Sequence, residues 1–138
     1  MKFFETHCEI AAPSARVWSI LTDTRRLVAG GMGLTRLDGA IAPNGRIKLW
    51  SEAAPNRAFS LRVTQFQPPH SMTWSGGMPL GLFKGERTFT LADSASGTSF
   101  RMREEYSGLI LRLIWKSIPD LNPSFGKFAA GLKRLAEA

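Results

Sequence analysis

The stretch that decides the fold is Ser107–Ala138, SGLILRLIWKSIPDLNPSFGKFAAGLKRLAEA. Its second half spaces apolar residues three and four apart, which gives one stripe on a helix with about 3.6 residues per turn. The members of this stripe are Phe125, Phe128, Ala129, Leu132, Leu135 and Ala136. Asn122 followed by Pro123 is typical of an N-cap and a first helical residue. A second stripe, formed by Ile110, Leu113, Ile114 and Ile118, precedes it, so we expect a long C-terminal helix that is broken once at 119–123.

Upstream of this helix the chain alternates between apolar and polar residues, which predicts strands. A first strand over Phe3–Ala11 is followed by two short helices, over Ala15–Leu21 and Thr24–Val28. Six further strands are expected over Leu34–Ile41, Arg46–Glu52, Ala58–Gln67, Ser71–Ser75, Leu82–Ala92 and Thr98–Tyr106. The predicted fold class is therefore α+β, with an antiparallel sheet of about seven strands packed on the C-terminal helix.

Two hairpins can be given a register from the alternation. With Ala95-Ser96 as the turn, the inner face of the last hairpin is mostly apolar, because it pairs Leu91 with Phe100, Phe89 with Met102, Arg87 with Glu104 and Gly85 with Tyr106. The outer face pairs Thr90 with Arg101 and Thr88 with Arg103. A turn at Pro55-Asn56 likewise pairs Leu49 with Leu61 and Ile47 with Val63 on the inner face.

The bulk properties are those of one soluble globular domain over residues 1–138. The single cysteine, Cys8, excludes an internal disulfide, and the absence of a signal peptide or a membrane-length apolar run points to the cytoplasm. The net charge of +7 and the pI near 10.3 raise nucleic acid or an anionic surface as a partner. The basic residues are scattered among acidic ones, which favours a solvated basic surface over a nucleic-acid face.

Several local motifs resemble the START-type helix-grip superfamily, also called SRPBCC. One is Ala11–Trp18 (AAPSARVW) with Leu21–Asp23 (LTD), and the other runs from Gly97-Thr98 through Glu104-Glu105 to Ser107–Leu109. The nearest branch looks like the polyketide cyclase/dehydrase and lipid-transport-like proteins. The resemblance covers the whole chain and implies a curved sheet gripping the terminal helix, with a deep apolar cavity between them. Members include lipid and hormone carriers, aromatase/cyclases and chaperone co-factors, so the fold alone does not decide the function.

The first candidate site residues are Arg87 and Glu104, which interrupt the apolar inner face of the last hairpin. Unpaired charges there would be costly, so we expect the two to bond to each other. The pair is either a structural salt bridge or the polar anchor of a pocket that orients a ligand carboxylate, hydroxyl or enolate. Glu104 could also act as the acid or base of a cyclase or dehydratase. Tyr106 follows on the same face, as a ligand contact, a weak acid or a core tyrosine.

The expected lining of the cavity is apolar. It comprises Leu61, Val63, Met72, Trp74, Phe83, Phe89, Met102, Phe125 and Phe128, with simple core packing as the alternative. Two glycine-rich loops, Gly30–Gly33 and Gly76–Gly81, carry Met32, Met78 and Leu80. They are either the mouth of the cavity or ordinary loops.

Metal and cofactor sites are not expected. His7 and His70 are far apart, Cys8 lacks an evident histidine partner, and no phosphate-binding or dinucleotide motif occurs. The leading hypothesis is a protein that binds a small hydrophobic or amphipathic molecule. The alternatives are a polyketide cyclase/dehydratase-like enzyme and a ligand-free interaction module that uses the basic surface or the outward Trp50. The oligomeric state is left open.

Overall fold

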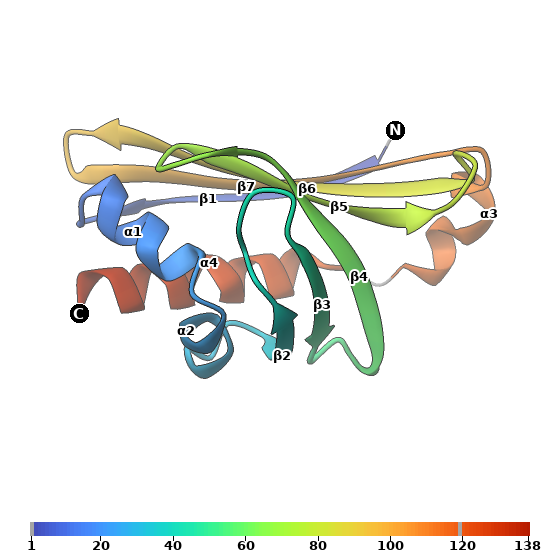
Figure 1. The fold of residues 1–138 in the computed structure, drawn as a ribbon, viewed down its shortest axis with the longest axis horizontal. Coiled ribbons are helices and arrows are strands. Elements are labelled where there is room, and N and C mark those ends of the chain that lie inside the picture. Colours follow the sequence, from blue (N-terminus) through green and yellow to red (C-terminus); the bar gives the residue numbers. More distant parts are fainter. Residues whose placement is uncertain (1, 119) are drawn as a thin grey trace.

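Seven antiparallel strands form one sheet in the order β1-β7-β6-β5-β4-β3-β2. The computed structural model that shows this describes residues 2–118 and 120–138. The strands are β1 (Lys2–Ile10), β2 (Leu34–Gly39), β3 (Arg46–Ser51), β4 (Ala54–Gln67), β5 (Ser71–Met78), β6 (Phe83–Ser94) and β7 (Gly97–Ser107). The helices are α1 (Ser14–Leu21), α2 (Thr24–Ala29), α3 (Leu111–Ile114), the 3-10 turn η1 (Trp115–Ser117) and α4 (Asn122–Glu137). The predicted α+β helix-grip fold is confirmed, with α4 lying beneath the curled sheet (Figure 1).

The two ends of the chain meet in this fold. β1 pairs with β7 from Lys2↔Tyr106 to Ile10↔Thr98, so the first strand lies beside the last one. α4 contacts β1 and β7 and also α1. The stripe predicted for α4 faces the sheet, where the Phe128 ring lies 5.8 Å from the Phe89 ring and 6.4 Å from the Phe100 ring. These contacts fill the space between sheet and helix at the middle of α4.

The register predicted for the last hairpin is confirmed at every pair. The sheet pairs Arg87 with Glu104 and Phe89 with Met102 on one face, and Thr88 with Arg103 on the other. The turn at Ala95-Ser96 is closed by the pair Ser94↔Gly97. This hairpin was predictable because its apolar and polar residues alternate without interruption on both strands.

The register predicted for the hairpin at Pro55 is wrong by two residues. Ile47 pairs with Leu61, not with Val63, and Leu49 pairs with Phe59. The chain turns earlier, because Ser51 already pairs with Ala54, and the register then shifts at an irregularity between Leu49 and Ser51. A shift of two residues keeps each side chain on its predicted face, and Ile47, Leu49 and Val63 are all buried.

The helical stretch before α4 is shorter than predicted. It consists of the single turn α3 and of η1, and Leu113, a member of the predicted stripe, is exposed while Leu111 is buried. α4 begins at Asn122 itself, whose N–H donates to the Asp120 carboxylate at 3.0 Å, so Asn122 is not the N-cap. Gly76–Met78 also extend β5 and are not part of a loop. Of the predicted break over 119–123, Pro119 lies outside the described residues, whereas Asp120 and Leu121 lie between η1 and α4 and belong to no helix.

Candidate ligand-binding site

Three polar side chains meet on the inner face of β6 and β7, and we call them the polar triad: Arg87, Glu104 and Tyr106. Arg87 Nε donates to Glu104 Oε1 at 3.2 Å. The Tyr106 hydroxyl donates to Glu104 Oε2, so each carboxylate oxygen accepts one hydrogen bond within the triad. The Arg87 and Glu104 side chains are each 16% exposed. The expected inward ion pair therefore exists, with Tyr106 as a third member.

The surroundings of Tyr106 keep its hydroxyl protonated. Burial, then the negative charge of Glu104, then the hydrogen bond to that carboxylate raise the pKa of Tyr106 well above its usual range. The positive charge of Arg87 opposes these effects without cancelling them. Within the triad, Tyr106 is therefore a hydrogen-bond donor and not a phenolate.

Aromatic rings from β1, β6, η1 and α4 enclose the triad. The Tyr106 ring stacks on Phe83 at 6.0 Å and meets Trp115 edge-on at 5.8 Å. Phe4 lies 6.0 Å from the Tyr106 ring and stacks on Trp115 at 5.8 Å. The Arg87 guanidinium lies over the Phe125 ring at 4.9 Å. The triad thus lies in an apolar shell of flat rings.

Trp74 adds a polar group that has no partner. It pairs with Arg87 across β5 and β6, its ring packs edge-on against Phe89 at 4.6 Å, and it is 1% exposed. Its indole Nε1 is buried without a hydrogen-bond partner among the residues that the structure describes. A buried donor left unpaired costs free energy, so a native structure usually supplies an acceptor.

The other predicted lining residues separate into two groups. Val63, Met72, Phe89, Met102, Phe125 and Phe128 are fully buried in the continuous core. Leu61 and Phe83 are half-buried, at the same end of the sheet as the triad. The prediction that the Gly30–Gly33 loop carries Met32 at the mouth of a cavity is wrong, because Met32 packs into the core. Met78 and Leu80 are exposed on the second loop.

Two aromatic members of the shell were not predicted as site residues. Alternation along the first strand places Phe4 on the same face as Cys8 and Ile10, but it does not predict the neighbour of Phe4, because the pair Phe4↔Glu104 joins the two ends of the chain. Trp115 lies in η1, within the predicted helical stretch but off the apolar stripe that predicted it. The signal in the sequence that could have pointed to them is the presence of large aromatic residues in these two segments.

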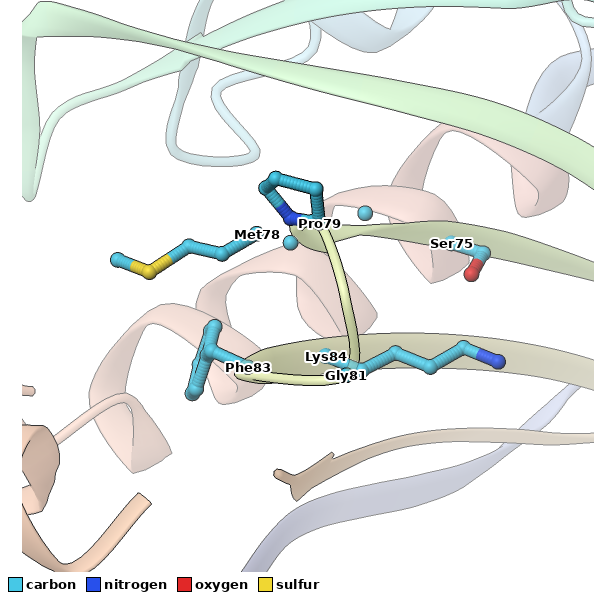
Figure 2. A pocket seen from close by; sticks show the side chains of 8 residues that line it. Ser75, Met78, Pro79, Gly81, Phe83 and Lys84 are labelled. Atoms are coloured by element: carbon cyan, nitrogen blue, oxygen red, sulfur yellow. The ribbon is translucent and has the colours of Figure 1, made fainter. Parts of the chain in front are cut away.

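Two open pockets lie on the described surface, and neither lies between the sheet and α4. The larger, about 430 Å³, lies at the β5–β6 hairpin and is lined by residues between Ser75 and Lys84, including Met78, Pro79 and Phe83 (Figure 2). The second, about 360 Å³, lies over polar side chains such as Thr88, Arg101 and Arg103 on the outer face of the sheet. The cavity expected between sheet and helix stays a prediction.

Among residues 2–118 and 120–138, no three histidine, cysteine, aspartate or glutamate side chains lie close enough together to hold a metal ion. No described helix has the length and hydropathy of a membrane span.

The fold and the polar triad define a helix-grip protein with a polar group buried among aromatic rings under its sheet. The chain belongs to the polyketide cyclase / dehydrase and lipid transport family, whose model matches residues 1–138. The sequence matches none of the curated proteins.

Solved structures share the fold at low sequence identity. A protein of Mesorhizobium loti is 17% identical with a TM-score of 0.73, and the match covers 97% of this chain and 96% of that one. The Aha1 dimer of Colwellia psychrerythraea is 19% identical with a TM-score of 0.74, covering 99% and 97%. The di-domain ARO/CYC StfQ of the steffimycin biosynthetic pathway is 13% identical with a TM-score of 0.66, and the match covers 98% of this chain and 49% of StfQ.

Proposed function

We propose that this chain binds a small hydrophobic or amphipathic molecule at the polar triad, between the sheet, η1 and α4. The observation that supports this most is a largely buried ion pair inside a shell of aromatic rings, beside an indole N–H that lacks an acceptor among the described residues. A ligand with a flat apolar body and an acceptor oxygen would stack on the rings and accept from Trp74 or Arg87. Each apolar Å² that it buries contributes about 25 cal/mol.

The donors at the site set the orientation of such a ligand. A guanidinium has five N–H groups, and only the Arg87 Nε–H is used by Glu104. The remaining N–H groups can bind a carboxylate, a carbonyl or an enolate oxygen. Apolar contact therefore supplies most of the affinity, and Arg87 supplies the preference for an oxygen-bearing ligand.

The wall formed by α3 and η1 is the most easily moved part of this shell. Leu111 is the one buried residue of α3, and η1 has none. Local opening costs least where few apolar side chains are buried. A ligand can therefore reach the triad by displacing this short segment, while β6, β7 and α4 stay packed around Phe89 and Phe128.

A pair of matched probes tests the proposal. 2-Naphthoate and naphthalene share one aromatic body, and only naphthoate carries a carboxylate. We expect Arg87→Ala to weaken naphthoate binding by about tenfold or more and naphthalene binding much less, because a charge-assisted hydrogen bond is lost. The control is Arg101→Ala, since Arg101 pairs with Glu5 on the outer face of the sheet. Equal losses for both probes would remove Arg87 from the binding site.

A native mass spectrum of the protein as purified complements this test, because a tightly held apolar ligand survives purification. A bound mass that is lost in Arg87→Ala supports the proposal. If neither probe binds and no mass is carried, the remaining hypothesis is the ligand-free interaction module.

A second candidate function is a cyclase or dehydratase-like reaction on a polyketide-type or aromatic substrate. The observation in its favour is that Glu104 holds a carboxylate between a protonated Tyr106 and Arg87. Glu104 could remove a proton next to a ketone, while Arg87 stabilises the enolate oxygen. Likeness in fold to StfQ is consistent with this, although it extends to the fold alone. Turnover of an aromatic polyketone thioester that Glu104→Gln abolishes, with the fold intact, would support it.

A further inference from the structure

One end of the molecule exposes large apolar side chains. Six such side chains are exposed among the described residues, and four of them belong to two adjacent segments: Met78, Leu80, Leu109 and Leu113. We call these four the apolar tip. Leu80, Leu109 and Leu113 are 91%, 82% and 80% exposed. Isolated apolar residues are ordinary on a surface, but a cluster of them marks a contact site.

Two backbone hydrogen bonds hold the segments of the tip together. Leu109 N–H donates to the Gly81 carbonyl at 3.2 Å, and Ile110 N–H donates to the Leu82 carbonyl at 3.0 Å. The hairpin between β5 and β6 therefore lies beside the start of α3, at the end of the sheet away from α1 (Figure 1). Figure 2 shows Met78, Pro79 and Phe83 among the residues that line the pocket at this hairpin. The tip is thus a defined apolar surface and not a set of frayed residues.

The charges around the tip are mostly positive. Residues 76–85 and 107–118 contain three cationic residues, Lys84, Arg112 and Lys116. Lys84 forms an ion pair with Glu86 at 3.5 Å, so the positive charge of the tip rests on Arg112 and Lys116. Lys2 adds a further cation, with its Nζ lying 5.5 Å from the centre of the Trp115 ring. Asp120 follows, but its carboxylate accepts from the Asn122 N–H at the start of α4. Apolar side chains among cations match a surface that is apolar inside and anionic outside.

We propose that the apolar tip docks this protein onto the surface of an anionic lipid bilayer. Leu80, Leu109 and Leu113 would enter the boundary between headgroups and acyl chains, and Arg112 and Lys116 would lie at the anionic headgroups. The attachment is peripheral, because no described helix could span the bilayer. Trp115 connects the tip to the polar triad through its contact with Tyr106, so docking would place α3 and η1 against the lipid. The docking does not depend on the proposed ligand and can be measured without one.

Vesicle sedimentation tests this directly. The purified chain is mixed with vesicles of phosphatidylcholine, or of phosphatidylcholine with roughly 30% phosphatidylglycerol. We expect a partition coefficient at least about tenfold higher for the anionic vesicles, which falls at about 0.5 M salt. Leu80→Ser/Leu109→Ser/Leu113→Ser should lower binding to anionic vesicles by about tenfold or more, because the apolar contribution is lost. These side chains are exposed, so circular dichroism should show an unchanged fold.

A charge control separates the tip from the overall positive charge. Arg112→Glu/Lys116→Glu and Arg46→Glu/Arg62→Glu change the net charge equally, and Arg46 and Arg62 are exposed partners on β3 and β4. We expect the first variant to lose vesicle binding and the second to retain most of it. Equal losses would overturn the proposal in favour of a non-specific charge effect. The proposal would also be overturned if the chain bound neither kind of vesicle. A dimer in light scattering that the leucine variant dissociates, with no binding to vesicles, would overturn it in favour of self-association.

Discussion

The guanidinium of Arg87 lies 4.9 Å from the centre of the Phe125 ring, while its Nε donates to Glu104. Arg87 thereby joins β6, β7 and the first turns of α4 through a single side chain. Such a contact restricts the guanidinium, because the ring covers one of its faces and the carboxylate fixes its edge. The fold therefore holds the Arg87 guanidinium in one place through contacts with Phe125 and Glu104.

This arrangement makes Arg87 important for stability. Arg87→Met keeps the unbranched apolar part of the side chain but removes the guanidinium, which leaves the Glu104 carboxylate with Tyr106 as its one donor in the triad. We expect the free energy of unfolding to fall by about 2 kcal/mol, because a largely buried charge loses its partner. Arg36→Met is the control, since the exposed pair with Asp38 should contribute less than about 1 kcal/mol. Urea unfolding at neutral pH measures both, and equal losses would mean that Glu104 is fully hydrated.

Tyr106 should make the protein less stable in alkali. Its pKa is raised in the folded chain by burial and by Glu104, so the folded state holds the phenolic proton more tightly than the unfolded state does. The contribution to stability is complete below the unfolded pKa of about 10 and is lost as the pH rises above it. We expect the free energy of unfolding to fall by up to about 1.4 kcal/mol per pH unit more steeply than in Tyr106→Phe.

The single tyrosine allows a second measurement of the same effect. Because Tyr106 is the one tyrosine in the chain, the ultraviolet absorbance of phenolate reports it alone. We expect the phenolate signal to rise only as the chain unfolds, as followed by circular dichroism. A phenolate that forms in the folded protein near pH 10 would contradict the buried hydrogen bond to Glu104.

Most of the fold could be predicted from local patterns, because elements such as β6, β7 and α4 bury one face. The last hairpin was predictable residue by residue, since Arg87 and Glu104 are the conspicuous charges on an apolar face. The β3–β4 hairpin was not, because its turn precedes Pro55 and an irregularity follows. Neither feature has a periodic signal in the sequence.

The site was predictable only in part for the same reason. The face on which all three members of the triad lie follows from strand alternation. The hydrogen bond from Tyr106 to Glu104 does not, because it depends on side-chain rotamers. The contribution of Phe4 depends on pairing between the two ends of the chain. The contribution of Trp115 depends on a short segment whose path is set by tertiary contacts. Non-local pairing of this kind is not encoded in a short window of sequence.

Acid should loosen the connection between the last turn of α4 and the end of β1. Glu137 accepts from the Ala11 N–H at 2.8 Å and from Lys133 at 2.7 Å. The backbone hydrogen bond from Ala11, and then the bond from Lys133, lower the pKa of Glu137. Its contribution to stability is therefore present above the unfolded pKa of about 4.3 and is lost as the pH falls through the folded pKa. Thermal unfolding between neutral and acid pH should show a smaller loss for Glu137→Gln than for the wild type, and an identical loss would exclude this contact.

Two glycines of α4 should respond oppositely to the same substitution. A Cβ at Gly126 would meet no atom within 4 Å beyond its own stretch of helix, whereas one at Gly131 would clash with Met32 Cγ and lie 3.2 Å from the Gly30 carbonyl oxygen. Alanine is favoured over glycine inside a helix by up to about 1 kcal/mol, so Gly126→Ala should raise the free energy of unfolding. Gly131→Ala should lower it by about 1–3 kcal/mol, because Met32 is buried and cannot move aside without disturbing the core. Chemical denaturation of the two variants measures the difference, and a gain in both would show that α4 does not pack closely on the Gly30–Gly33 loop.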